Sequence, residues 1–181
     1  MLLEPVRVVP SVAIFGVGHV GLELARVLSR QQLELHLVDS RAEMLSAERL
    51  GDPGSTGVLA DAVATVRVHH LPVPESALAE LPPGAHVLVM THDHVEDLAI
   101  VESALRTPGL GSIGLIGSRS KWARFTTQLR EAGFGDDDLA RVSTPIGIEG
   151  IRSKEPAAIA VSVAARVLQQ VEGAAATTST S

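Results

Sequence analysis

Short apolar runs alternate along the chain with segments in which apolar residues recur every three or four positions. The runs predict buried strands, and the recurring pattern predicts helices that pack on them. The expected strands are 12–15, 33–38, 65–69, 86–90 and 113–116. The expected helices are 20–29, 41–50, 76–81, 95–105, 121–132 and a last one that begins near Pro156. This alternation favours an α/β fold, a doubly wound, mainly parallel Rossmann-like sheet with helices on both faces.

The alternation runs without a break, so a single Rossmann-like domain is expected over residues 6–172. The tail, residues 173–181, consists mainly of Ala, Thr and Ser and is expected to be disordered because it has little to bury. The glycine- and proline-rich segment 51–57 predicts a surface loop. Aromatic residues make up only 2% of the chain, so the core must be aliphatic, as in a buried parallel sheet.

Composition excludes several classes of function. A net charge of −6 argues against a nucleic-acid partner, because binding to phosphate backbones needs clustered Lys and Arg. No apolar run approaches the roughly 18 residues of a membrane span, and no secretion signal is recognisable, so a cytoplasmic protein without a membrane partner is expected. The chain contains no cysteine, which rules out disulfides, thiolate nucleophiles and cysteine metal sites within it.

The first expected strand leads directly into a G-x-G-x-x-G motif. Gly16 permits a tight turn, Gly18 lets the backbone approach a ligand, and Gly21 lets the following helix pack close to the strand. Free N–H groups at the start of that helix suit a phosphate. The predicted cofactor contacts of this loop are Gly16, Gly18, His19, Val20 and Gly21.

Asp39 ends the second expected strand, where an acid that binds the ribose of a dinucleotide is expected about 20 residues after the glycine loop. Such an acid favours an unphosphorylated ribose. Arg41 follows it and could instead accommodate a 2′-phosphate, so the sequence leaves the choice between NAD and NADP open.

A polar group, Thr91-His92-Asp93-His94, follows an almost wholly apolar strand. Thr91 can hydrogen-bond a ligand, Asp93 can fix a histidine tautomer, and His92 or His94 can accept a proton or ligate a metal. The set is incomplete as a metal site, and no metal is assigned. The alternative is that Thr91 or Asp93 caps the next helix.

The fifth expected strand is followed by Gly117, Ser118, Arg119, Ser120 and Lys121. Two hydroxyls and two cations at the start of a helix suit an anion, so Gly117, Ser118, Arg119 and Lys121 are predicted cofactor contacts. The alternative is an ordinary capped helix with a solvated basic turn.

Ligands of open α/β sheets bind beyond the carboxyl ends of the strands, where the strand order reverses. The three polar loops are therefore expected to face one crevice. Arg152 and Lys154, in the glycine-bearing segment 145–156, could add charge to it. No catalytic residue is assigned.

Four segments occur in a fixed order: GVGHVG with Asp39 and Arg41, MTHDHVEDLAI (90–100), GLIGSRSKWARF (114–125) and PIGIEGIRSKEPAAIAVSVAA (145–165). Together they resemble the Rossmann-type C-terminal domain of the xanthine dehydrogenase accessory factor family, of the XdhC and CoxI type. The resemblance implies a protein that binds molybdenum cofactor (molybdopterin), supports its sulfuration and hands it to xanthine dehydrogenase. It also implies a cysteine desulfurase as a second partner, a homodimer, and an accessory role without catalytic turnover.

The chain departs from this family in one respect. Full-length relatives carry a preceding domain with cysteine, so a cysteine ligand to molybdenum would have to come from elsewhere. We expect a truncated or split member, or a homologue whose ligand is only a nucleotide. The alternative functions are an NAD(P)-linked oxidoreductase, with catalysis by His92 or Asp93, and a nucleotide-sensing regulatory module.

Overall fold

The computed structural model describes residues 8–51 and 56–178. Its strands form one six-stranded sheet in the order β3-β2-β1-β4-β5-β6. The strands are β1 (Ser11–Phe15), β2 (Glu34–Asp39), β3 (Thr65–His70), β4 (His86–Val89), β5 (Ser112–Leu115) and β6 (Val142–Ser143). Every neighbouring pair is parallel, which confirms the expected doubly wound α/β fold.

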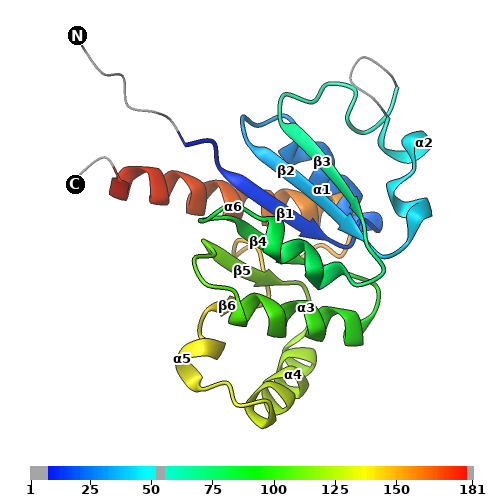
Figure 1. Ribbon diagram of the computed structural model, residues 1–181. Coiled ribbons are helices and arrows are strands. Elements are labelled where there is room, and N and C mark those ends of the chain that lie inside the picture. Colours follow the sequence, from blue (N-terminus) through cyan, green and yellow to red (C-terminus); the bar gives the residue numbers. More distant parts are fainter. Residues whose placement is uncertain (1–7, 52–55, 179–181) are drawn as a thin grey trace.

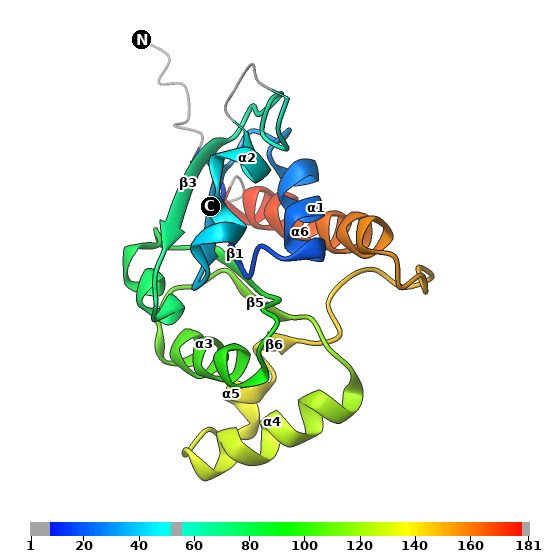
Figure 2. The same ribbon diagram turned by 90° about the vertical axis from the view of Figure 1, so that its right-hand side faces the viewer.

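Helices cover both faces of this sheet (Figure 1). The α-helices are α1 (His19–Leu28), α2 (Ala47–Leu50), α3 (His94–Arg106), α4 (Arg119–Glu131), α5 (Asp136–Leu139) and α6 (Pro156–Thr178), with 3-10 turns η1 (Ala42–Leu45) and η2 (Pro74–Glu80). Helices α1 and α6 pack together on one face, and α3 lies on the other, as the turned view in Figure 2 shows. The two helical layers bury β1, β2, β4 and β5, whereas the edge strand β3 is largely exposed.

Side chains of β1 illustrate why the strand is apolar from Val12 to Phe15. Val12 and Ile14 point into the core beneath α1 and α6, where they join Leu24. Ala13 and Phe15 point into the opposite core, beneath α3. Because successive side chains of a strand face opposite sides, a strand covered on both faces has no polar alternation.

The structure differs from the expected elements in three details. Residues 76–81, expected to be a helix, lie mainly in the 3-10 turn η2, which spans Pro74–Glu80. Residues 41–50, expected to be one helix, form the turn η1 and the short helix α2, which are separated at Ser46. Strand β6 was not predicted, because its two residues are too few for a periodic pattern.

Helix α6 continues through Gly173 to Thr178, so the part of the tail before residue 179 is helical, where disorder was expected. The alanines that follow Gly173 have the highest helix propensity of all residues and extend the helix. Residues 179–181 of that tail, and 52–55 of the expected surface loop, lie outside the described residues. Within the described part of the chain, we find no helix with the length and apolar character needed to cross a bilayer.

Candidate functional site

The glycine loop turns the chain from β1 into α1 beside the end of β4. Gly16 has φ +98°, and a Cβ there would lie 2.5 Å from the Met90 carbonyl oxygen. A Cβ on Gly21 would overlap the Gly16 carbonyl oxygen. A Cβ on Gly18, in contrast, would meet no described atom within 4 Å. Gly16 and Gly21 are therefore required by packing, and the open space is beside Gly18.

Asp39, the predicted ribose acid, is buried at the end of β2 with a side-chain exposure of 1%. Its Oδ2 accepts from the Val17 N–H at 2.7 Å and from Arg41 Nη2 at 3.1 Å. Its Oδ1 accepts from the Arg41 N–H and from Arg41 Nε, both at 3.0 Å. Burial alone would raise the pKa of Asp39, but the hydrogen bonds from Arg41 and Val17 outweigh it and lower that pKa.

A crevice of about 580 Å³ opens at the carboxyl edge of the sheet, in the size range of ligand pockets. Its lining residues follow β1, β2, β4 and β5, the strands on either side of the point where the order reverses. They are Gly18, His19, Val20, Arg41, Met44, Arg49, Met90, Thr91, His92 and Ile116. The ionisable residues in this lining are two arginines and two histidines, with no carboxylate among them.

The loop after β4 divides its polar residues between the crevice and the next helix. Thr91 and His92 line the crevice. Asp93 caps α3, because its Oδ1 accepts from the Val95 N–H at 2.7 Å and the Glu96 N–H at 3.4 Å. These hydrogen bonds lower the pKa of Asp93. Asp93 therefore acts as the cap of α3, the alternative role that the sequence left open.

His94, the first residue of α3, does not line the crevice. Its Nδ1 is 3.1 Å from Arg124 Nη2, and the two residues line a separate hollow between α3 and α4. Among the described residues, no three histidine or carboxylate side chains gather to hold a metal ion. His92 and His94 thus do not act on one ligand in this arrangement.

The loop after β5 begins α4 and contributes only Ile116 to the crevice lining. Ser118 caps α4 by accepting from the Lys121 N–H at 3.2 Å, and its Oγ is 2.9 Å from Ser120 Oγ. Arg119 is exposed, and Gly117 packs against the Lys121 side chain. The Ser118 hydroxyl therefore caps α4, which is the alternative of an ordinary capped helix that the sequence left open.

Lys121, predicted to supply charge to an anion, is buried and already paired. Its Nζ donates to the Asp97 carboxylate and, at 3.0 Å, to the Ile116 carbonyl oxygen. Asp97 is fully buried and also accepts from the Thr91 N–H at 2.9 Å. This ion pair ties the loop after β4 to the loop after β5, which gives Lys121 a structural role where a ligand contact was expected.

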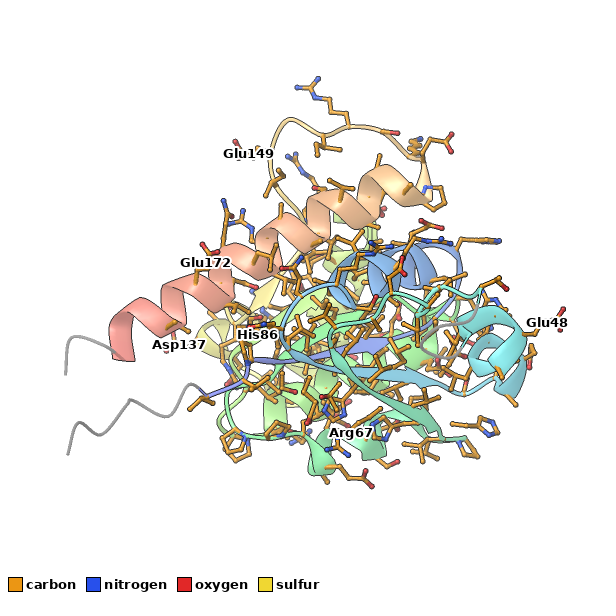
Figure 3. All side chains as sticks on the ribbon, turned by 90° about the horizontal axis from the view of Figure 1, so that it is seen from above. Glu48, Arg67, His86, Asp137, Glu149 and Glu172 are labelled. Carbon is orange, nitrogen blue, oxygen red and sulfur yellow. The ribbon has the colours of Figure 1, made fainter. Side chains whose placement is uncertain are left out.

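Of the predicted contacts, the crevice brings together Gly18, His19, Val20, Arg41, Thr91 and His92. Gly16, Gly21 and Asp39 shape the loop beside it, while Asp93, His94, Gly117, Ser118, Arg119 and Lys121 do not line it. Arg152 and Lys154 are exposed outside its lining, in the loop before α6 that carries Glu149 and projects from the body in Figure 3.

Sequence reasoning missed Arg49 as a crevice residue. Its Nη1 donates to the Val17 and Met44 carbonyl oxygens at 2.9 and 3.0 Å. Helical structure is interrupted at Ser46, between η1 and α2, and Arg49 on α2 contacts the glycine loop. Reading residues 41–50 as one helix hid this contact; a potential capping residue at position 46 was the only available signal.

A second polar cluster lies at the sheet edge, on β2, β3 and η2. His36 Nδ1 is 2.9 Å from His69 Nε2, and His36 Nε2 is 2.7 Å from Glu34 Oε1. Arg67 pairs with Glu34 and extends from the side of the sheet opposite α6 (Figure 3). Burial, followed by the charge of His36, lowers the pKa of His69. Burial also lowers the pKa of His86, on β4.

We expect the free energy of unfolding to fall as the pH drops from about 7 to below about 6. The unfolded imidazoles of His69 and His86 take up protons near their ordinary pKa of 6.5, while the folded ones stay neutral to lower pH. The unfolded state then binds more protons, so acid favours it. Urea unfolding at about pH 7.5 and about pH 5.5 measures the difference.

The variant His69→Gln should lose less stability between these two pH values than the wild type. His19, which is exposed, provides the matched control His19→Gln. An equal loss in His69→Gln and in the wild type would contradict the assignment to His69.

The strand order, the glycine loop after β1 and the crevice at the carboxyl edge define a Rossmann-type domain. The chain belongs to the family of XdhC Rossmann domains, whose model matches residues 12–167. The resemblance carried by the four ordered segments is thereby confirmed.

One relative and one solved structure extend this comparison. The chain is 29% identical over 160 residues to the uncharacterized protein YqeB of Escherichia coli K12, covering 88% of this chain and 27% of YqeB. A crystal structure described as a xanthine dehydrogenase from Bacillus halodurans matches with a TM-score of 0.69 at 23% identity, covering 91% of this chain and 43% of that one. The chain therefore spans about a quarter of YqeB. The structural likeness, at this identity, bears on the fold alone.

Proposed function

We propose that this domain binds molybdenum cofactor as a cargo in the crevice and serves the maturation of xanthine dehydrogenase by delivering it. One observation carries the proposal: a domain of the XdhC family has a ligand-sized crevice whose ionisable lining residues are arginine and histidine. A lining of this kind suits an anionic ligand. Molybdopterin carries a phosphate, so the donor set fits it.

The residues of the crevice have distinct tasks in this proposal. The backbone beside Gly18 is free of side chains and admits the phosphate. Arg49 supplies positive charge at the same loop. His19 and His92 are exposed at the crevice, where a receiving protein can reach them. The buried Asp97–Lys121 pair holds the loops after β4 and β5 in place.

Binding is tested by mixing the purified protein with molybdopterin and separating the mixture by size. The wild type should co-elute with the pterin, and Gly18→Val should lose at least about tenfold in affinity, because its side chain fills the open space beside the loop. Gly173→Ala, on α6 and outside the crevice lining, is the matched control. Absence of co-eluting molybdopterin from the wild type, or equal binding by Gly18→Val, would contradict the proposal.

Delivery is tested with apo-xanthine dehydrogenase. Protein loaded with the cofactor should restore dehydrogenase activity faster than the same amount of free cofactor. If the loaded protein restores activity no faster than free cofactor does, the protein binds the cofactor but does not deliver it.

A further inference from the structure

The carboxylate of Asp39 has no acceptor position left for a ribose. Each oxygen of a carboxylate accepts about two hydrogen bonds. Oδ1 and Oδ2 each receive two already, from Arg41 and from the Val17 N–H. The side chain is also 1% exposed. Ribose hydroxyls, which a Rossmann acid binds by accepting from them, would have to displace the Arg41 guanidinium.

The charge that faces the crevice beside Asp39 is positive. Arg41 covers Asp39 and lines the crevice with a side-chain exposure of 26%. Arg49 lines it too, and in the described part of the chain it pairs with no carboxylate; it donates to carbonyl oxygens instead. Glu43 and Glu96 lie close enough to act on Arg41, yet neither lines the crevice. Arg49 thus brings a charge that the fold leaves uncompensated.

We infer that Arg41 and Arg49 form a subsite for a phosphate monoester, so that the crevice takes a nucleotide with a phosphorylated ribose in preference to one with free ribose hydroxyls. This inference rests on the proposal that the crevice holds a phosphate-bearing ligand. The arginines satisfy a dianion by charge-assisted hydrogen bonds, and the saturated Asp39 offers nothing to a ribose diol. The 2′-phosphate of NADP and the phosphate of a pterin share this chemistry.

Calorimetry with NADP⁺ and NAD⁺ as probes tests the subsite. The wild type should bind NADP⁺ at least about tenfold more tightly than NAD⁺, the ratio that one charge-assisted contact supports. Arg49→Gln should lose most of this preference by weakening NADP⁺ binding, with little change for NAD⁺. Arg26→Gln, on the exposed face of α1, is the matched control and should keep the preference.

Arg49 also donates a hydrogen bond to the glycine loop, so a second variant is needed to separate this structural role from phosphate binding. Arg49→Lys keeps the charge and should keep part of the preference, whereas a purely structural role would weaken both dinucleotides equally in Arg49→Gln. Equal wild-type affinities, tighter binding of NAD⁺, or binding of neither dinucleotide below millimolar concentration would overturn the inference. None of these results touches the proposed function, which depends on co-elution of molybdopterin.

A competition arm distinguishes the two sources of the phosphate. Displacement of bound molybdopterin by NADP⁺ but not by NAD⁺ supports the subsite with the pterin phosphate as its occupant. Preferred binding of NADP⁺ without displacement supports the subsite with a phosphorylated nucleotide as its occupant.

Discussion

Replacing Lys121 with methionine is expected to lower the free energy of unfolding by about 3–5 kcal/mol, the usual cost of removing one partner from a buried ion pair. Asp97, its partner, is fully buried, and without Lys121 its charge would have no ion-pair partner among the residues that the structure describes. Among the described residues, the Thr91 N–H would then be the only hydrogen-bond donor to that carboxylate. Urea unfolding of the two proteins at neutral pH measures the loss.

Two further variants separate the buried charge from lost packing. The double variant Lys121→Met with Asp97→Asn removes both charges and keeps an acceptor for the Thr91 N–H, so it should recover part of the loss. Arg30→Gln breaks an exposed ion pair with Asp61 and should change stability little. A loss in Lys121→Met no larger than in Arg30→Gln would show that the buried pair does not hold the two loops together.

Replacing Gly16 with alanine is the second change with a large expected effect, a destabilisation of about 2–5 kcal/mol. The positive φ of +98° strains any residue with a Cβ, at about 1–2 kcal/mol. The new Cβ would also approach the Met90 carbonyl oxygen to 2.5 Å, and relieving such overpacking costs about 1–3 kcal/mol more. The contact involves backbone on both sides, so no side chain can move away to relieve it.

Gly18→Ala is the control within the same motif. Gly18 has φ −74°, and its Cβ would meet no described atom within 4 Å, so the folded state should accept alanine with little loss. Thermal or urea unfolding of the two variants gives the comparison. Equal destabilisation of Gly16→Ala and Gly18→Ala would mean that the turn does not depend on the backbone freedom of Gly16.

The sequence predicted what depends on local pattern. Strands β1, β2, β4 and β5 follow from short runs that are mainly apolar, because a strand buried on both faces is apolar at most positions, whereas the edge strand β3 is largely exposed. The glycine loop follows from residue spacing, since Gly16 and Gly21 are needed for a turn that the next helix must approach closely. The family follows from four ordered segments and is confirmed by the match over residues 12–167.

The candidate site was less predictable. Of the three polar loops expected at one crevice, those after β1 and β4 line it, whereas the loop after β5 contributes only Ile116. The sequence alone could not assign each polar residue to a ligand or to a helix end. Asp93 and Ser118 cap helices because the first N–H groups of α3 and α4 need acceptors. The same residue types cap helices and bind ligands, so only the three-dimensional structure shows which role a given side chain has.

The sequence by itself therefore determined the strand and loop framework of this protein, because periodicity and glycine spacing are local properties of the chain. Only the tertiary structure decided which polar groups remain free. The Asp39 acceptors are occupied by donors that include Val17, and Lys121 is occupied by Asp97, in both cases through contacts between distant segments. A charged group is available to a ligand only if no other part of the protein already pairs with it, and those pairings form only when distant segments come together in the fold.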